Sequence, residues 1–492
     1  MALVERVLPA EAVPDLAAYI DRYQGGRALD VATKVPTSAL LDELDASGLR
    51  GRGGAGFPTG RKWRTVLASR SDDMPATVVV NAAEGEPGTF KDRTILRANP
   101  YHVLEGALIA ARVVGADTVV VALKATFTEE LERVRRAIDE IVKAGWCEGI
   151  DLQVVEGPGE YLYGEETALL EVIDGRAPLP RIAPPYRRGV DELVDDVDEV
   201  DTGSGLAAPI EMASETRGNE VPPTLVDNVE TLANVPMLAL KGSDWFRQVG
   251  TMESPGTIVC TITGRVERPG VGEVALGTTL REAITEIAGG PLADHTISAL
   301  LPGVSSAFIP PEALDTPMTY EALAAIGSGL GSAGFVVLDD TDDIVAAAAG
   351  VSRFLAIESC GQCTACKQDG LVMSELLCQL GRSEADQNDL EALMHRCTTV
   401  TDGARCNLAM QQQAVVSGVL RRWGGTVAEH IAGTAAPRGP LIVAELVNID
   451  ADGDAVIDLR HEDKQPDWTY DERDSGMAPA DRLADHRMDA TT

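Results

Sequence analysis

Four cysteines in the C-terminal third of the chain are spaced for metal ligation. Cys360, Cys363 and Cys366 form a Cys-x2-Cys-x2-Cys run, and Cys406 follows after 39 further residues. Three cysteines at this spacing can surround one corner of an iron–sulfur cubane, which a distant fourth cysteine completes. Structural zinc is the main alternative, but zinc sites usually pair two Cys-x2-Cys units rather than chain three cysteines. The spacing therefore predicts an Fe–S cluster.

A second chemical feature is a loop rich in both glycine and cations. Residues 48–63 read Gly-Leu-Arg-Gly-Arg-Gly-Gly-Ala-Gly-Phe-Pro-Thr-Gly-Arg-Lys-Trp, with six glycines, three arginines and a lysine. Glycines let the backbone approach a ligand closely, and backbone N–H groups beside cations bind phosphate. Residues 51–56 fit the dinucleotide fingerprint G-x-G-x-x-G only loosely, because no apolar strand runs directly into them. We predict a phosphate seat here; the alternative is a surface loop built for a tight turn.

Carboxylates and glycines follow two apolar segments that are expected to be strands. Residues 81–93 read Asn-Ala-Ala-Glu-Gly-Glu-Pro-Gly-Thr-Phe-Lys-Asp-Arg, and residues 161–167 read Tyr-Leu-Tyr-Gly-Glu-Glu-Thr. In open parallel sheets, ligands lie beyond the carboxyl ends of the strands. Carboxylates there can hold a ribose or ring N–H groups, although they can equally be first-turn acids of a helix.

Hydrophobic patterning predicts the scaffold that positions these motifs. Short apolar runs alternate with amphipathic segments, which indicates a Rossmann-like, three-layer α/β domain with right-handed crossovers. The expected strands are 76–81, 118–123 and 151–155, and the expected helices are 102–114 and 127–143.

Changes in composition and hydrophobic pattern along the chain divide it into five segments. We expect an N-terminal helical lead, an α/β nucleotide-binding domain with an acidic insertion at about 189–221, an α+β domain of β-grasp (ubiquitin-like) type, a helical domain with the four cysteines, and an acidic, partly disordered tail. Their ranges are 1–45, 46–250, 256–340, 343–432 and 433–492. A glycine run at 327–334 is expected to reach back to the first domain, and a hairpin is expected at 441–459. Cys378 and Cys397 are expected to be buried helix residues.

Composition limits the partners. The 492 residues carry 42 Lys and Arg against 77 Asp and Glu, a net charge of −35. This charge disfavours nucleic acid and anionic membrane surfaces. No signal peptide or membrane-spanning run is expected, and clustered cysteines suggest metal ligation in a reducing compartment, so we predict a cytoplasmic protein.

Together these motifs resemble a known family over about residues 45–414. The chain is similar to the flavin-bearing, NADH-oxidising subunit of respiratory NADH:quinone oxidoreductase, and to the diaphorase subunits of NAD-linked hydrogenases and formate dehydrogenases. The resemblance implies that FMN and one [4Fe–4S] cluster pass electrons from NADH to partner Fe–S proteins, and that Glu84 and Glu165 act at the flavin. A thioredoxin-like [2Fe–2S] partner would be a separate subunit.

The resemblance also implies a set of binding residues. The cluster ligands would be Cys360, Cys363, Cys366 and Cys406. The flavin and nucleotide contacts would be Gly51, Arg52, Gly53, Gly54, Phe57, Lys62, Asn81, Glu84, Glu86, Gly164, Glu165, Glu166, Asn228 and Thr231. Among these, Phe57, Glu86 and Glu166 would face the nicotinamide nucleotide.

Several positions depart from the family pattern. Ala83 stands where the family has an aspartate, Thr65 replaces an aromatic residue, Ala183 replaces a lysine, and Asp227 stands for an asparagine. Two alternatives to NADH oxidation follow: an FMN/Fe–S protein with another donor, or a non-catalytic paralogous subunit. We further predict that Glu165 disfavours the anionic reduced flavin by charge repulsion.

Overall fold

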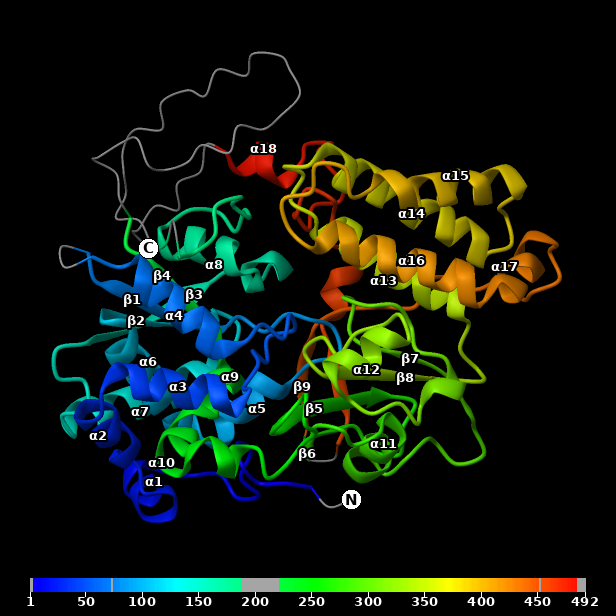
Figure 1. Ribbon diagram of the computed structural model, residues 1–492. Helices are drawn as coiled ribbons and strands as arrows, with labels where there is room; N and C mark the ends of the chain where they lie inside the picture. The colour runs from blue at the N-terminus through cyan, green and yellow to red at the C-terminus, as the bar shows by residue number, and fades with distance from the viewer. Residues whose placement is uncertain (1–2, 72–73, 187–188, 190–220, 451–452, 485–492) are drawn as a thin grey trace.

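The computed structural model describes residues 3–71, 74–186, 189, 221–450 and 453–484 (Figure 1). Short helices open the chain, as the sequence predicts for residues 1–45. They are α1 (Leu16–Tyr23), α2 (Arg27–Lys34) and α3 (Thr37–Ser47), and α4 (Thr59–Ser69) follows the glycine-rich loop. The acidic insertion predicted at 189–221 lies outside the described residues, except for its first and last positions.

A four-stranded parallel sheet forms the centre of the first half of the chain. Its order is β3-β2-β1-β4, with β1 (Ala76–Ala82), β2 (Ala116–Lys124), β3 (Asp151–Gly157) and β4 (Thr224–Asn228). Six helices accompany it: α5 (Lys91–Ala98), α6 (Pro100–Val114), α7 (Thr128–Lys143), α8 (Glu166–Ile173), α9 (Val229–Ala233) and α10 (Val235–Phe246).

Central strand β1 shows why the sequence forms this sheet. Its β-branched residues are buried on both faces: Val78 and Val80 pack into one apolar cluster, and Val79 packs into another with residues of α8. A near-continuous apolar run is what a parallel strand covered on both sides requires. The predicted Rossmann-like parallel sheet is confirmed.

A second, mixed sheet follows. Its order is β6-β5-β8-β7, with β5 (Thr257–Gly264), β6 (Gly270–Ala275), β7 (Ile297–Leu301) and β8 (Gly334–Asp339). β5 and β8 are parallel, whereas the two outer pairs are antiparallel. Helix α11 (Leu280–Ala288) begins with a capping box between Thr279 and Glu282. Two short helices lie between β7 and β8: η2 (Pro311–Ala313) and α12 (Tyr320–Ala325).

The glycine run at 327–334 reaches back to the first sheet, as predicted. The hydroxyl groups of Thr89 and Ser332 lie 3.0 Å apart. A Cβ atom at Gly334 would lie only 2.2 Å from Thr89 Oγ1, so this crossing requires glycine. The segment after β1 and the segment before β8 are therefore in direct contact.

Five helices occupy the cysteine-rich region. They are α13 (Ile344–Glu358), α14 (Thr364–Gly381), α15 (Gln387–Thr399), α16 (Leu408–Arg422) and α17 (Gly424–Ile431). Cys378 on α14 and Cys397 on α15 are buried in their apolar core, as predicted. Among the helices that the structure describes, none is long and apolar enough to cross a membrane.

The tail expected to be partly disordered, residues 433–492, forms defined structure over residues 453–484. A hairpin of β9 (Leu446–Ile449) and β10 (Ala455–Ile457) leads into η3 (Leu459–Glu462) and later α18 (Pro479–Leu483). Between them the Trp468 side chain is buried, and its indole N–H donates to the Ile357 carbonyl at 2.9 Å. In Figure 1 this segment, in orange-red, returns to the helical region.

Charged side chains also anchor the tail. Lys464 Nζ lies 2.7 Å from Glu358 Oε1 on α13, and His461 Nε2 lies 3.2 Å from the same oxygen. The His461 ring stacks on the Phe354 ring, with centroids 4.8 Å apart. The polar composition that suggested disorder is thus used in a buried ion pair and a buried hydrogen bond with Glu358 of α13.

Candidate functional site

The glycine-rich loop is a tight structure at the carboxyl edge of the first sheet. The Gly51 N–H donates to the Phe57 carbonyl at 2.8 Å, which closes the loop on itself. The backbone N–H of Arg52 donates to Thr231 Oγ1 at 2.8 Å, so the loop is tied to α9, directly after β4. Gly54 has φ +126°, a conformation open to glycine.

The loop presents bare backbone where the sequence predicts a phosphate seat. A Cβ atom at Gly51 would meet nothing closer than 3.6 Å, and one at Gly54 nothing closer than 3.8 Å. At Gly53 it would meet Asn228 Cβ at 3.3 Å, so the loop and the end of β4 are closely packed. This arrangement fits a phosphate-bearing ligand, because exposed backbone can approach it closely.

Arg52 braces the loop from behind. Its guanidinium is buried and donates to the backbone carbonyls of Arg50 and Thr257. Each side-chain nitrogen is engaged in this way, so a direct contact of Arg52 with a ligand stays a prediction. The structure gives the residue a bracing role between the loop and β5.

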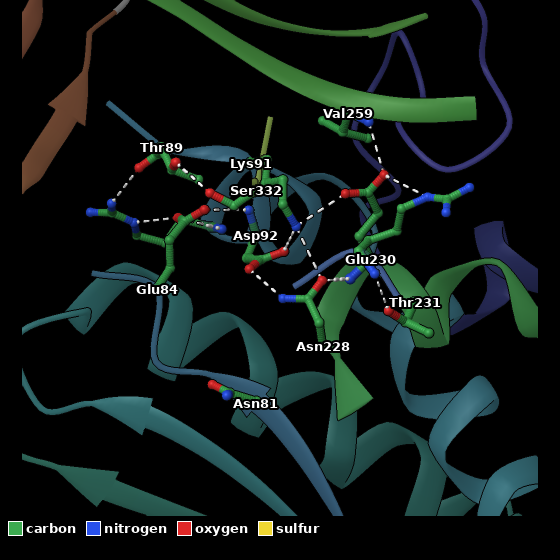
Figure 2. Close-up of polar contacts among 12 residues, drawn as sticks. Asn81, Glu84, Thr89, Lys91, Asp92, Asn228, Glu230, Thr231, Val259 and Ser332 are labelled. Atoms are coloured by element: carbon green, nitrogen blue, oxygen red, sulfur yellow. Dashed lines mark hydrogen bonds and ion pairs between the residues drawn. The ribbon is translucent and has the colours of Figure 1, made fainter. Parts of the chain in front are cut away.

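Lys91 is the centre of a buried polar network between the two sheets (Figure 2). Its ammonium lies 2.7 Å from Asp92 Oδ1, 3.1 Å from Asn228 Oδ1 and 3.0 Å from Glu230 Oε2. Glu230 in turn accepts the Val259 N–H of β5 at 2.8 Å. Burial raises the pKa of Asp92 to about 6, although Lys91 stabilises its charged form. The network fixes Asn228, a predicted flavin contact.

Glu84 has its carboxylate engaged within the protein. Oε1 accepts the Asp92 N–H at 3.0 Å, and Oε2 accepts Arg93 Nε at 2.9 Å. The carboxylate therefore lies at the N-terminus of α5, where a negative charge is favourable. This geometry supports a positioning role, and direct action of Glu84 on a cofactor stays a prediction.

Asn81 connects the end of β1 to the segment that follows β3. Its Nδ2 donates to the Gly164 carbonyl at 2.9 Å, and its Oδ1 accepts the Ala83 N–H at 3.2 Å. Asn81 lies at the end of β1, whereas Gly164 ends η1 (Tyr161–Gly164), which follows β3. The two stretches predicted to meet at one edge are therefore in contact.

The two glutamates that follow have different environments. Glu165 is the N-cap of α8: its Oε2 accepts the N–H groups of Thr167 and Ala168 at 3.0 and 2.8 Å. Burial raises the pKa of Glu165 despite these hydrogen bonds. Glu166 instead forms an ion pair with Lys62, at 2.5 Å.

Glu86 connects the sheet edge to both later regions. The Tyr161 hydroxyl donates to Glu86 Oε2 at 2.5 Å, and the Val304 N–H donates to Oε1 at 2.8 Å. The same hydroxyl lies 3.4 Å from Gln411 Oε1 on α16. Burial raises the pKa of Glu86.

Phe57, the other predicted nucleotide contact, lies at the surface of the glycine-rich loop. Its side chain is 46% exposed, and the Arg61 guanidinium lies 5.7 Å from its ring centroid. An exposed aromatic face of this kind can stack on a planar ligand.

The four cysteines predicted as metal ligands line one pocket. Cys360, Cys363, Cys366 and Cys406 share it with Leu162 and Pro180, which come from the first half of the chain. Gly361, between the first two cysteines, has φ +86°, so the turn that presents them uses a glycine conformation. The prediction that these cysteines come together agrees with this pocket.

The spacing of the sulfurs favours a cubane over zinc. Four sulfurs around one zinc at about 2.3 Å would lie about 3.8 Å from one another. Within the described ranges, the one group of three or more His, Cys, Asp and Glu whose ligand atoms all lie within 4.8 Å is His295, Asp339 and Asp340. No three of the four cysteine sulfurs are therefore all within 4.8 Å of one another, a wider spacing than tetrahedral zinc needs.

The sheet edge and the cysteine pocket are neighbours. Leu162 lines the pocket, and two residues later Gly164 accepts the Asn81 hydrogen bond at the sheet edge. Gln362, within the cysteine motif, donates to the Pro180 carbonyl at 3.1 Å. One short segment therefore contacts both predicted cofactor sites.

Sequence reasoning missed the roles of Lys91 and Tyr161. Lys91 stands in the quoted 81–93 motif, next to Asp92 and Arg93, where a cation beside acids could have indicated a buried network. Tyr161 opens the quoted 161–167 motif, but its contacts with Glu86 and Gln411 are long-range and leave no local signal.

Three family models match parts of the chain. Residues 44–237 match the Nuo51 FMN-binding domain, residues 259–299 match the SLBB domain, and residues 346–430 match the NADH-ubiquinone oxidoreductase-F iron-sulfur binding region. The fold and the two sites thus define an FMN and [4Fe–4S] protein, and the predicted cofactors are confirmed.

Curated relatives and a solved structure agree. One NADH-quinone oxidoreductase F subunit of Rhizobium meliloti (strain 1021), numbered 2, is 35% identical over 86% of this chain and 97% of its own length. The F subunit of Mycobacterium tuberculosis (strain ATCC 25618 / H37Rv) is 34% identical over 85% and 91%. The crystal structure of an NAD+-reducing [NiFe]-hydrogenase in the H2-reduced state superposes with a TM-score of 0.71 and 30% identity, over 86% of this chain and 67% of that one. The chain belongs to the family of NADH-quinone oxidoreductase F subunits.

Proposed function

We propose that this chain oxidises NADH and delivers the electrons to partner Fe–S proteins. FMN held at the glycine-rich loop would supply a hydride acceptor for NADH, and a [4Fe–4S] cluster held by Cys360, Cys363, Cys366 and Cys406 would supply one-electron transfer. The observation that carries this proposal is the contact between the two sites. Residues 162–164 line the cysteine pocket at one end and bind Asn81 at the other.

The residues of the sheet edge hold and orient the flavin. The glycine loop supplies backbone N–H groups for the phosphate, and Asn81, Asn228 and Thr231 supply polar groups from β1, β4 and α9. Lys91, Glu230 and Glu84 hold these residues in place through the buried polar network and the N-terminus of α5. Phe57, Glu86 and Glu166 are proposed as contacts of the nicotinamide nucleotide, of which Phe57 is exposed enough to stack on it.

The finer architecture is also proposed. The second sheet, with a parallel central pair and α11 against it, suits a β-grasp fold, and α13–α17 suit a helical bundle around the cluster ligands. We propose domain ranges of 46–250, 256–340 and 343–432 on this basis. As a family member the chain is a subunit of a larger complex. A separate thioredoxin-like [2Fe–2S] acceptor and a cytoplasmic location remain predictions.

Anaerobic titration tests the function. The purified protein, loaded with FMN and iron–sulfide, is titrated with NADH and separately with NADPH while flavin and cluster absorbance are followed together. We expect the first additions of NADH to bleach the flavin absorbance. Further additions of NADH should then bleach the cluster absorbance as well. No measurable bleaching of the flavin by NADH would reject the proposal. Equal bleaching by NADPH would show that the protein is not specific for NADH as its donor.

A further inference from the structure

Lys62 lies at a junction of three elements at the sheet edge. It projects from α4, and its ammonium lies 2.5 Å from the Val226 carbonyl on β4 and 2.5 Å from Glu166 Oε1 at the start of α8. Asp227 Oδ1 lies 3.8 Å away. The Lys62 side chain keeps 27% of its surface exposed, although its ammonium contacts all three elements.

Asp227 is held firmly beneath this junction. It is 5% exposed, and its second oxygen accepts the indole N–H of the fully buried Trp63 at 2.7 Å. Trp63 follows Lys62 directly in α4. The Asp227 carboxylate therefore contacts the side chains of two adjacent residues of this helix. In β4 it stands opposite Val80 of β1, one residue before Asn228.

The charges of this group do not balance. One ammonium faces two carboxylates, so the group carries about one negative charge in partly buried surroundings, where charges interact more strongly than in water. Burial alone would lower the pKa of Lys62, but Glu166 and Asp227 outweigh it and raise the pKa. Lys62 therefore stays protonated.

We propose that Asp227 is a positioning residue that fixes the Lys62 ammonium between β4 and α8 and thereby sets the charge beside bound flavin. The flavin part of this inference rests on the proposed function. With Lys62 paired to two carboxylates, its charge is largely cancelled, so reduction of the flavin gains little from it. Without the Asp227 charge, the positive charge of Lys62 is less fully compensated. The local electrostatic potential is then more positive, which favours the reduced, more negative flavin.

Asp227→Asn isolates the charge, because the amide oxygen can still accept the Trp63 hydrogen bond. The first measurement needs no cofactor: competitive acetylation of Lys62 in the full chain, quantified by mass spectrometry. We expect acetylation about ten-fold faster in the variant if the pKa falls by one unit. Lys34, whose side chain is 75% exposed, is the internal reference, and Asp339→Asn, another buried aspartate, is the control variant. Unchanged Lys62 labelling overturns the inference.

The second measurement is the flavin midpoint potential, by anaerobic redox titration. We expect Asp227→Asn to raise it more in the wild-type background than in a Lys62→Met background, because only the first also releases the ammonium from one of its two carboxylates. An equal rise in both backgrounds would show that Asp227 acts without Lys62 and would overturn the positioning role. A wild-type protein that NADH does not reduce would instead reject the proposed function, whatever the labelling shows.

Discussion

Trp468→Ala is the sharpest test of the ordered tail. The indole is buried against the α13 region and donates to the Ile357 carbonyl at 2.9 Å. Replacing a buried tryptophan by alanine costs about 3–5 kcal/mol, of which the lost hydrogen bond accounts for about 1 kcal/mol. At about 1.4 kcal/mol per factor of ten, local opening of the tail becomes about 100-fold or more frequent.

Two other contacts between the tail and the helical region remain in the Trp468→Ala variant. Lys464 still pairs with Glu358, and the Ala480 N–H still donates to the Cys360 carbonyl at 2.8 Å. We therefore expect the tail to open while the helices stay folded, because the loss is local.

Hydrogen–deuterium exchange of the holoprotein measures this opening. Peptides covering 459–484 should exchange about 100-fold faster in Trp468→Ala, whereas peptides of β1 should not change. Tyr470→Ala is the matched control, since that aromatic residue lies two positions away and is 54% exposed. Equal exchange in the wild type and in Trp468→Ala would refute the packing argument.

Three further predictions follow. Cys363→Ser should remove the cluster signal in electron paramagnetic resonance and leave the flavin bound, whereas Cys378→Ser should keep both, because that thiol packs in the helical core. Glu165→Gln should raise the flavin midpoint potential, since it removes a charge beside the site, and an unchanged potential would count against a role for this carboxylate. Burial lowers the pKa of His102 to about 3, below its unfolded value of about 6.5, so the unfolding free energy should fall as pH drops from 6.5 towards 3, by up to about 1.4 kcal/mol per unit. Urea denaturation across this range should lose that slope in His102→Gln and keep it in His395→Gln.

The cysteine motif and the sheet could be predicted because their signals are local. Cys360, Cys363 and Cys366 lie within one turn and the start of α14, so their spacing along the chain nearly determines their spacing in the fold. The run at 76–81 is apolar or β-branched at every position but its last, and a strand covered on both faces suits such a pattern. Cys406 is distant in sequence, and the need of a cubane for a fourth ligand was what pointed to it.

The partners of charged residues could not be predicted. Arg52 and Glu84 stand in motifs typical of ligand binding, yet both are paired within the protein. Sequence gives the type of a charged side chain but not whether its counter-charge belongs to the protein or to a ligand. For Lys91, the partner Glu230 lies far along the chain, and only the fold brings them to 3.0 Å.

The ordered tail was missed for a related reason. Lys464, Asp467 and Trp468 lie in a stretch whose composition is typical of disorder. Composition counts charges without regard to whether each has a buried partner, and Glu358 on α13 supplies one. A single tryptophan in a polar stretch was the available signal, since a large aromatic residue gains most from burial.

The charge balance of the site differs from that of the whole chain. The protein carries −35, but the buried network holds three cations and three anions: Arg52, Lys91 and Arg93 with Glu84, Asp92 and Glu230. A flavin phosphate would therefore meet neither strong repulsion nor a free cation there. Lys62 adds no net positive charge either, because Glu166 and Asp227 both lie within 4 Å of it. The N–H groups of Gly51 and Arg52 are already bonded to the Phe57 carbonyl and to Thr231 Oγ1, so the neutral backbone donors that remain for the phosphate are those of Gly53 and Gly54. This explains why glycines are needed beside Arg52, whose side chain faces the protein.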